Sequence, residues 1–574
     1  MNNSMAARLS VLLGLLASTL PVRAQLYSEQ YIGDLGGGET QTSAINGYGK
    51  VTGRSSLPGD RIFHAILWNG TTMRDLGTLG GTQSYGAAIN AAGQVTGFSD
   101  TASDAAQHAF LWNGTAMEDL GTLGGSNSEG TGINASGEVT GWSQTPGNAA
   151  EHAFLWNGTT MKDLGTLGGT NSSGVAINDS GQVAGSSDVI GNAHSHAFLW
   201  KGASMKDLGT VGGAPTVEPF AMNNAGQVVG AARNDSYSVE TGFLWDGSKL
   251  VDLNALTGAT RSYASALNAK GEVTGWAVLS TDKKIHSYLW KGTEAFRLDV
   301  NTASDREFNF CDTGTGISSS TGLIVGETCE EAGLNYPFFW NGFAMVDLAN
   351  LVAPADFNLD LGASPLINNQ GQILDGPYVL SPIPGAIALN IAQPYTIAGC
   401  QNVAGYVSSS TPAPPGGLVI SLSDTLAAAS VPSTVTISAG AIGATFTIST
   451  MPVSNVQSGV ITATRNGRTV SQDLSVRPMG VAAITLTPST VTGGKTVAGN
   501  VALECGAAPA TITVSLSSSN KSLARPVPST ITIPKGQSSA AFQVTTQKVP
   551  SRVLVTIKGS ANGISKTANL KLNR

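Results

Sequence analysis

Residues 89–121 read INAAGQVTGFSDTASDAAQHAFLWNGTAMEDLG, and this stretch decides the fold. The same order of motifs returns from Ile133 and again from Ile177, so the stretch is one copy of a repeated unit. Self-similarity at a period of 20–50 residues is typical of repeat architectures. The landmark tryptophans of successive units are 44 to 50 residues apart and are Trp68, Trp112, Trp156, Trp200, Trp245, Trp290 and Trp340.

Each unit predicts four short strands. A first strand ends at Asn90, and a turn at Gly93 leads into a second strand. The third strand, 109–112, is apolar on both faces, and the hairpin signal Asn113-Gly114 connects it to the fourth. A sheet that buries both faces needs neighbours on both sides. Stacked four-stranded units of this length predict an all-β, closed β-propeller, with an open β-solenoid as the alternative.

The two ends of the repeat region predict how the propeller closes. Eight turn glycines (Gly49, Gly93, Gly137, Gly181, Gly226, Gly271, Gly322 and Gly371) stand against seven landmark tryptophans. The last unit has no fourth strand after Leu380, whereas residues 31–36 resemble a fourth strand without its unit. We expect this N-terminal strand to complete the last sheet and remove both sheet edges. Eight blades follow from this count, and seven is the alternative if the degraded last unit packs elsewhere.

The repeated His-Ala-Phe-Leu-Trp, with Asp-Leu-Gly-Thr-Leu-Gly-Gly and Ile-Asn-x-x-Gly-Gln-Val, resembles the extracellular repeat family named for its His-Ala-Phe tripeptide. The resemblance covers about residues 30–380. It implies bacterial export and a repeated β architecture, and it implies no established activity. Later units depart from the pattern, because Thr241 and Tyr336 replace the histidine and the eighth unit lacks the tryptophan.

The regions outside the repeat have different compositions. Residues 1–24 combine Arg8 with an apolar run and small residues near Ala24, which predicts a signal peptide. The propeller is then expected over 25–384. Beyond it, residues 431–437 are echoed by residues 527–533 among alternating short strands. This pattern predicts two immunoglobulin-like β-sandwiches, at 385–477 and 478–574.

The repeated polar residues are interpreted as structural. One histidine in most units lies four residues before the landmark tryptophan: His64, His108, His152, His196 and His286. A repeated aspartate follows: Asp75, Asp119, Asp163, Asp207, Asp252 and Asp347, with Asp34 as a further copy. We expect each imidazole to hydrogen-bond a backbone group or this aspartate, and each carboxylate to cap a turn. Equivalent positions in separate blades lie too far apart for one zinc ion.

The seventh unit breaks the repeat and is the better place for a unique site. We predict a Cys311–Cys329 disulfide, with two free thiols as the alternative. Nearby aromatic and charged residues suggest a ligand rim, against the simpler alternative of a solvated insertion. The rim residues are Arg306, Phe308, Phe310, Glu330 and Glu331. Cys400 and Cys505 occupy non-equivalent places in the two modules, so their pairing is possible but unsupported.

Charge and motifs limit the function. The net charge of −7 argues against a nucleic-acid binder. No nucleophile elbow, metalloprotease helix motif or Cys-x-x-Cys ligand set is present, so we predict no catalytic residue, cofactor or metal.

We expect a monomeric, non-catalytic protein that is secreted or at the cell surface, with the periplasm as an alternative. It would bind a glycan or a surface protein and span no membrane after signal cleavage. The alternatives are a polysaccharide lyase or hydrolase with its site in the channel, and a purely structural surface protein.

Overall fold

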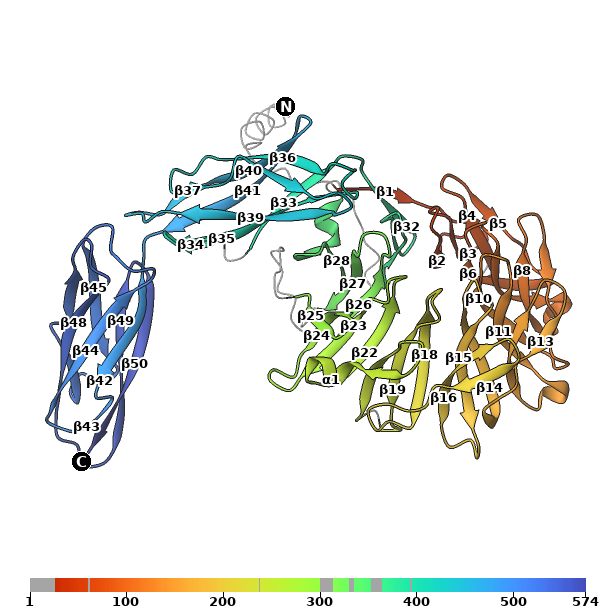
Figure 1. Cartoon of the computed structure of the whole chain (residues 1–574), viewed down its shortest axis with the longest axis horizontal. Helices are drawn as coiled ribbons and strands as arrows, with labels where there is room; N and C mark the ends of the chain where they lie inside the picture. The colour runs from red at the N-terminus through yellow and green to blue at the C-terminus, as the bar shows by residue number, and fades with distance from the viewer. Residues whose placement is uncertain are drawn as a thin grey trace, which may run out of the picture.

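The computed structural model describes residues 26–59, 62–236, 238–299, 313–329, 335–352, 364–392 and 395–574. These residues form antiparallel sheets almost throughout (Figure 1). The predicted signal peptide, 1–24, lies outside them. None of the helices in the described ranges is long and apolar enough to cross a membrane.

The described repeat units form eight four-stranded sheets, numbered here along the chain as sheets 1 to 8. Sheet 1 consists of β2 (Thr40–Ile45), β3 (Val51–Ser56), β4 (Phe63–Trp68) and β5 (Met73–Asp75), and sheet 2 consists of β6 (Gly80–Ile89), β7 (Val95–Thr101), β8 (Gln107–Trp112) and β9 (Met117–Asp119). Sheet 3 consists of β10 (Ser128–Ile133), β11 (Val139–Gln144), β12 (Glu151–Trp156) and β13 (Met161–Asp163), and sheet 4 consists of β14 (Gly168–Ile177), β15 (Val183–Val189), β16 (Ser195–Lys201) and β17 (Ser204–Asp207).

Sheets 5 to 8 depart further from the consensus unit. Sheet 5 consists of β18 (Thr216–Met222), β19 (Val228–Arg233), β20 (Glu240–Trp245) and β21 (Leu250–Asp252), and sheet 6 consists of β22 (Ala259–Leu267), β23 (Val273–Leu279), β24 (Ile285–Lys291) and β25 (Glu294–Arg297). Sheet 7 consists of β26 (Thr313–Ile317), β27 (Ile324–Cys329), β28 (Asn335–Trp340) and β29 (Met345–Asp347), and sheet 8 consists of β1 (Tyr27–Tyr31), β30 (Leu366–Ile367), β31 (Ile373–Asp375) and β32 (Tyr378–Pro382). Short helical turns occur between strands: η1 (Ala102–Asp104), η2 (Pro146–Asn148), α1 (Leu253–Thr257) and η3 (Leu348–Leu351).

The turn residues specify each sheet locally. Gly93 has φ +89°, a conformation that glycine adopts without steric cost. The Asn90 Oδ1 accepts the Gln94 amide at 3.0 Å inside the same turn. In the next hairpin, Asn113 Oδ1 accepts the Thr115 amide at 3.0 Å. These two hairpin turns of sheet 2 are therefore closed by their own asparagine side chains.

The prediction of a closed β-propeller, with eight or seven blades, is wrong. The described residues form many small antiparallel sheets, and among them no barrel or propeller closes. Strand pairing stays within each group of four, because the signals in the repeat are hairpin turns and cross-strand pairs between neighbours in the chain. The period therefore specifies the sheets without specifying a closed assembly of them.

The N-terminal segment nevertheless completes the eighth sheet. β1 pairs antiparallel with β32, so that Tyr27 lies opposite Pro382 and Tyr31 opposite Tyr378. The predicted strand, 31–36, lay about four residues too late in the chain. Sheet 8 also contacts sheet 1 through a hydrogen bond from Asn368 Nδ2 to the Asn46 carbonyl at 2.9 Å.

The C-terminal region consists of two modules, each with one four-stranded and one five-stranded sheet. Module 1 contains β33 (Ile387–Ile391), β35 (Val403–Ser409), β39 (Gly443–Thr450) and β37 (Ala429–Ser430), facing β34 (Thr396–Ala398), β41 (Arg468–Arg477), β40 (Gln457–Arg465), β36 (Leu418–Asp424) and β38 (Thr434–Ile437). Module 2 contains β42 (Val481–Thr487), β44 (Thr496–Leu503), β48 (Ser539–Thr546) and β46 (Ala524–Val527), facing β43 (Thr490–Thr492), β50 (Ile564–Asn573), β49 (Val553–Ala561), β45 (Ile512–Ser518) and β47 (Thr530–Ile533).

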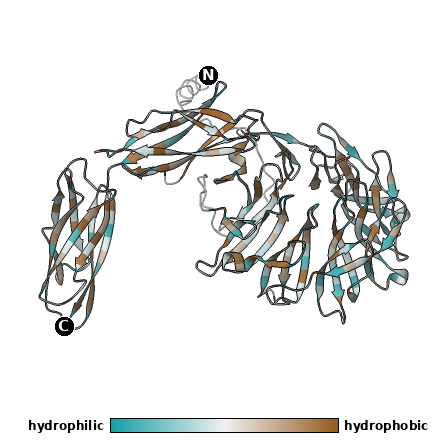
Figure 2. Cartoon of the chain, viewed as in Figure 1, coloured by the Kyte–Doolittle hydropathy of each residue, from teal (hydrophilic) through white to brown (hydrophobic). Residues whose placement is uncertain are grey.

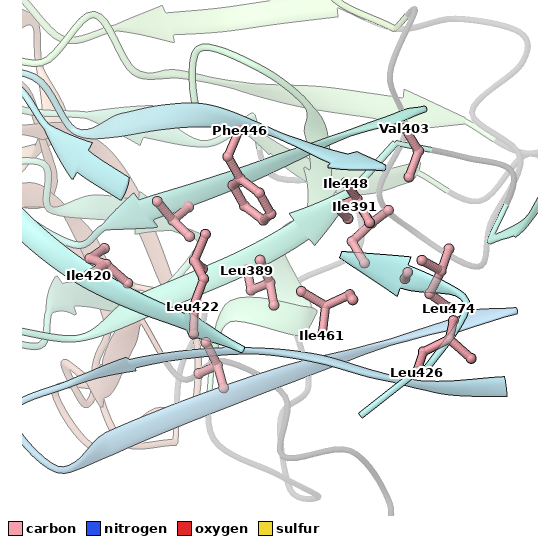
Figure 3. Close-up of a cluster of buried hydrophobic side chains, with 14 of the residues drawn as sticks. Leu389, Ile391, Val403, Ile420, Leu422, Leu426, Phe446, Ile448, Ile461 and Leu474 are labelled. Atoms are coloured by element: carbon pink, nitrogen blue, oxygen red, sulfur yellow. The ribbon is translucent and has the colours of Figure 1, made fainter. Parts of the chain in front are cut away.

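Alternating apolar residues build the core of each module. In module 1, Leu389 and Phe446 from one sheet and Ile461 from the other belong to a single buried cluster (Figure 3). Apolar and polar residues alternate along many of these strands (Figure 2). This is the period-2 pattern of strands buried on one face.

Module 1 packs directly against the repeat region. The Tyr406 ring stacks on Phe343 with centroids 4.7 Å apart, and its hydroxyl donates to the Asn341 carbonyl at 2.8 Å. Ile442 joins a buried cluster that contains Leu26 and Tyr27. The first module therefore shares apolar contacts with sheets 7 and 8.

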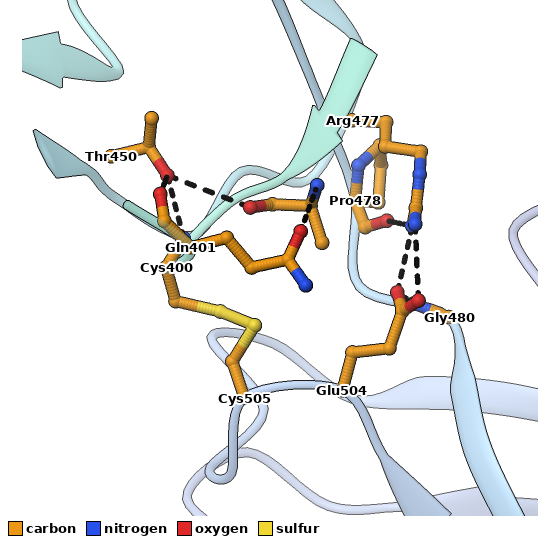
Figure 4. Close-up of a disulfide and its surroundings, with 9 residues drawn as sticks. Cys400, Gln401, Thr450, Arg477, Pro478, Gly480, Glu504 and Cys505 are labelled. Atoms are coloured by element: carbon orange, nitrogen blue, oxygen red, sulfur yellow. Dashed lines mark hydrogen bonds and ion pairs between the residues drawn. A yellow bond between two sulfur atoms is a disulfide. The ribbon is translucent and has the colours of Figure 1, made fainter. Parts of the chain in front are cut away.

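The two modules are linked covalently and by an ion pair (Figure 4). Cys400 and Cys505, whose pairing the sequence left unsupported, form a disulfide. Arg477 contacts both carboxylate oxygens of Glu504 at 2.7 and 3.0 Å. Glu504 also accepts the Gly480 amide at 2.8 Å.

Candidate functional site

Buried asparagines form a series of hydrogen bonds between successive sheets, and this series belongs to the scaffold. Asn90 Nδ2 donates to the Asn134 carbonyl at 3.0 Å, and Asn134 Nδ2 donates to the Asn178 carbonyl at 3.1 Å. Within its own turn, the Asn134 Oδ1 accepts the Glu138 amide at 2.9 Å. One side chain thus closes a turn and joins two sheets.

The repeated histidines form the expected hydrogen bonds with the repeated aspartates in four units. The Nδ1 atoms of His64, His108, His152 and His196 lie 2.8–2.9 Å from Asp75, Asp119, Asp163 and Asp207, respectively. The Asp75 Oδ1 also accepts the Gly77 amide at 2.7 Å, which is the turn cap expected of these carboxylates. Burial alone would raise the pKa of Asp75, but the hydrogen bonds from His64 and Gly77 hold it below its ordinary value.

In sheet 6, the repeated histidine contacts a different carboxylate. Arg297 stands where the other units have the aspartate, opposite Tyr288. The carboxylate bound to His286 Nδ1 at 2.8 Å is instead Asp299, which Arg297 Nη2 also contacts at 2.7 Å. Asp282 accepts from the other ring nitrogen of His286 at 3.0 Å. Here too, the imidazole is held by carboxylates from its own unit.

Three of the landmark tryptophans, Trp112, Trp200 and Trp245, pack against cations from the preceding sheet. The Arg74 guanidinium lies 4.5 Å from the ring centroid of Trp112, and Lys162 Nζ lies 4.6 Å from that of Trp200. Such contacts between a cation and an aromatic ring are favourable, and here they connect neighbouring sheets. The tryptophans therefore act as scaffold residues between units.

One cross-strand pair in each unit varies while the positions around it stay the same. It lies one residue from the glycine of the second strand, within sequences such as Val-Thr-Gly-x-Ser. In sheets 1 to 7 the pairs are Gln41–Arg54, Tyr85–Phe98, Glu129–Trp142, Ser173–Ser186, Glu218–Ala231, Tyr263–Trp276 and Thr313–Glu327. We call this set the variable row.

The aromatic pair of sheet 6 in the variable row is extended by a third ring from sheet 5 that lies outside the row. Tyr263 stacks on Trp276, with ring centroids 5.8 Å apart and planes 4° from parallel. Phe220, the bulged residue of β18 two positions after Glu218, stacks on Tyr263 with centroids 4.8 Å apart. All three side chains are partly exposed. Three rings from two sheets thus form one continuous stack.

Ion pairs border this stack. Arg261 Nη2 lies 2.5 Å from Glu240 Oε2, and the Arg261 guanidinium lies 5.7 Å from the Trp276 ring. Arg233 pairs with Glu218. Burial and the charges of Glu240 and Glu218 raise the pKa of Tyr263, so its hydroxyl stays protonated at neutral pH.

A second aromatic group lies at sheets 1 and 2. Tyr85 and Phe98 have centroids 5.8 Å apart, and the Arg54 guanidinium of the neighbouring sheet lies 5.8 Å from the Tyr85 ring. Arg54 also donates to Gln41 at 2.9 Å. In sheet 3, burial raises the pKa of Glu129, the cross-strand partner of Trp142.

The ligand rim predicted in the seventh unit stays a prediction. Arg306, Phe308, Phe310, Glu330 and Glu331 lie outside the described residues. So does Cys311, and with it the predicted Cys311–Cys329 disulfide. Within the described ranges, no group of three or more His, Cys, Asp or Glu side chains is placed to hold a metal ion.

The repeated motifs of the sequence do not reveal the variable row, because the residues of the row differ from unit to unit. The signal that finds it is the opposite one, namely a position that changes between units whose other positions do not. The sequence displays this signal in the residue after each Val-Thr-Gly or equivalent, from Arg54 to Glu327.

Comparisons with known proteins yield weak structural likenesses. No family model and no curated protein matches the chain. Among solved structures, the chain is similar to the D0-D1 domain of intimin, at 13% identity over 31% of this chain and 95% of that chain, with a TM-score of 0.15. The Yersinia pseudotuberculosis adhesin InvE matches at 12% identity over 33% of this chain and 59% of that one, with a TM-score of 0.18. The calcium-binding domain CBD12 of CALX1.1 matches at 11% identity over 29% of this chain and 77% of that one, with a TM-score of 0.19.

Proposed function

We propose that this chain is an exported, non-catalytic binding protein that recognises a glycan through the variable row, outside the cell or at its surface. The observation that carries the proposal is the contrast within each unit. The turn asparagines, histidines and tryptophans serve the scaffold, whereas the variable row holds partly exposed aromatic and charged residues that the scaffold does not require.

Aromatic rings with adjacent hydrogen-bonding groups are suited to sugars. A pyranose ring has an apolar C–H face that packs on an aromatic side chain, while its hydroxyl groups need donors and acceptors at the edge. The variable row supplies rings at Tyr85, Phe98, Trp142, Tyr263 and Trp276, and supplies arginines and carboxylates beside them.

The inter-module disulfide supports export. Disulfides persist in oxidising compartments and are rare in the reducing cytosol. Cys400 and Cys505 connect two modules that are also joined by the short linker near Pro478 and by the Arg477–Glu504 ion pair. An oxidising location outside the cytoplasm fits this bond.

Binding and turnover can be separated in one experiment. The protein would be incubated with a panel of immobilised glycans and, in parallel, with the same glycans in solution followed by mass spectrometry. We expect retention on one glycan class with unchanged ligand mass. Shortened products would contradict the non-catalytic assignment, and retention of surface proteins without any glycan would contradict the ligand class.

A matched variant tests the site. Tyr85→Ser with Phe98→Ser reproduces the pair that sheet 4 already contains, Ser173–Ser186, so the fold should tolerate it. Combining it with Tyr263→Ser and Trp276→Ser should abolish glycan retention. Full retention by a folded quadruple variant would contradict the variable row as the binding surface.

A further inference from the structure

The aromatic stack of sheets 5 and 6 is specific to that part of the chain. Sheet 4 has Ser173 and Ser186 at the positions of Tyr263 and Trp276. At the bulge of the first strand, where sheet 5 has Phe220, sheet 3 has Thr131. The unit therefore folds with small side chains at all three positions. The stack of rings at sheets 5 and 6 needs an explanation other than folding.

The charges beside the stack are already balanced. Arg261 is paired with Glu240, and Arg233 with Glu218. The Arg261 side chain is 43% exposed, and those of Arg233 and Glu218 are 28% and 26% exposed, so donors and acceptors both reach the surface. An anionic ligand would gain from the arginines and lose to the carboxylates at nearly the same distance. A neutral ligand with many hydroxyl groups can donate to Glu218, the more exposed of the two glutamates, and accept from the arginines at once.

One donor in this group has no protein partner. Within the described part of the chain, the Arg261 Nε–H makes no hydrogen bond although it is buried. Leaving a buried donor unsatisfied costs free energy, and a ligand hydroxyl that reached this donor after a small shift of the partly exposed Arg261 side chain would recover that cost. This donor lies in the side chain that also contacts the Trp276 ring and Glu240.

We propose that the Phe220–Tyr263–Trp276 stack, with its paired Arg233–Glu218 and Arg261–Glu240, is a subsite for neutral hexopyranose oligosaccharides. This inference rests on the proposed glycan-binding function and adds the ligand class and the location. The sugar's C–H face packs on the rings, and its hydroxyl groups bridge the arginine and glutamate side chains. Uronic-acid or sulfated glycans are disfavoured, because the paired glutamates offset the arginines and leave the desolvation cost of the anion uncompensated.

Calorimetric titration of the full chain tests the ligand class. The neutral probes are cellohexaose, maltohexaose and mannohexaose, and the acidic probe is hexagalacturonate. We expect at least one neutral probe to bind at least about tenfold more tightly than the acidic one. Tighter binding of the acidic probe would overturn the neutral-sugar subsite and leave the proposed glycan-binding function standing. Binding of none of the probes, together with no retention on a wider glycan panel, would overturn both.

Variants test the location. Tyr263→Ser with Trp276→Ser should weaken binding of the neutral probe by about tenfold or more, as expected when aromatic contacts at the centre of a site are lost. The control, Tyr48→Ser in the exposed turn between β2 and β3, lies outside the variable row and should change it by less than about twofold. Loss of binding in the control with retention in the double variant would overturn the location. Phe220→Thr, which introduces the residue of sheet 3, provides a second test if the double variant unfolds, and unchanged binding in that folded variant would likewise overturn the location.

Discussion

The repeat sheets and the C-terminal modules are both built from short antiparallel strands, but different interactions hold them together. In the repeat region, buried polar side chains such as Asn134, Ser128 and Thr140 connect turns, strands and neighbouring sheets. In the modules, the largest buried apolar clusters of the described chain fill the space between two sheets. In the repeat region, buried side-chain hydrogen bonds thus act beside several smaller apolar clusters, whereas each module is built around one large apolar cluster.

This difference explains where variation is tolerated. In a hydrogen-bonded unit, the residues that satisfy the turns must recur, and a position that makes no such bond is free to change. The variable row occupies those free positions. In a sandwich module, every second residue of a strand contributes to one shared core, so fewer positions are free.

The largest effect is expected in a module core. Phe542 is 4% exposed, and its ring lies over Gly499 of the neighbouring strand. Phe542→Ala should lower the free energy of unfolding of module 2 by about 3–5 kcal/mol, because it removes a buried ring and leaves a cavity. Calorimetric unfolding should show the module transition shifted and the repeat transition unchanged. An equal shift of both transitions would contradict the separation of the two regions.

A smaller effect is expected for the asparagine series. Asn134→Ala should destabilise the repeat region by about 1–3 kcal/mol, since it leaves the Glu138 amide and the Asn178 carbonyl without their side-chain partner. Asn134→Ser is the control, because sheet 7 has Ser318 at this position of the turn and the hydroxyl keeps an acceptor there, so it should cost less. Denaturant unfolding of residues 25–574 measures both. If the alanine variant is as stable as the parent, hydrogen bonds do not specify these sheets.

The smallest effect concerns the contact between the modules. The hydrogen bond from Arg477, with the Gly480 amide, holds the pKa of Glu504 below its ordinary value. Because the folded pKa is lowered, the contribution of this pair is fully present above pH 4.5 and is lost as the pH falls below that value. We expect about 1 kcal/mol of acid destabilisation from this pair. Thermal unfolding between pH 3 and 6 should show it, and Glu504→Gln should remove it; an unaltered pH profile in that variant would contradict the assignment.

The sequence predicted what its local signals encode. The period identified the units, and Asn113-Gly114 and its copies located the hairpins. The spacing of His108 and Asp119 anticipated their hydrogen bond. The closed propeller was predicted wrongly because turn and pairing signals act within one unit. The Cys400–Cys505 bond was left open, since two single cysteines in different modules carry no spacing signal.

The candidate site was less accessible to prediction. The aromatic residues of the variable row differ from unit to unit, so a search for repeated chemistry passes over Tyr263 and Trp276. Their stacking with Phe220 also depends on a bulge in β18 and on the contact between sheets 5 and 6. Neither feature is visible in the spacing of the unit.

The most direct test of the account measures glycan affinity and stability together in Tyr263→Ser with Trp276→Ser. The account predicts that the variant, which carries the serine pair of sheet 4, unfolds within about 1 kcal/mol of the parent while its glycan affinity falls about tenfold or more. Unchanged affinity in the folded variant would contradict it, and so would a large loss of stability, because the rings would then belong to the scaffold.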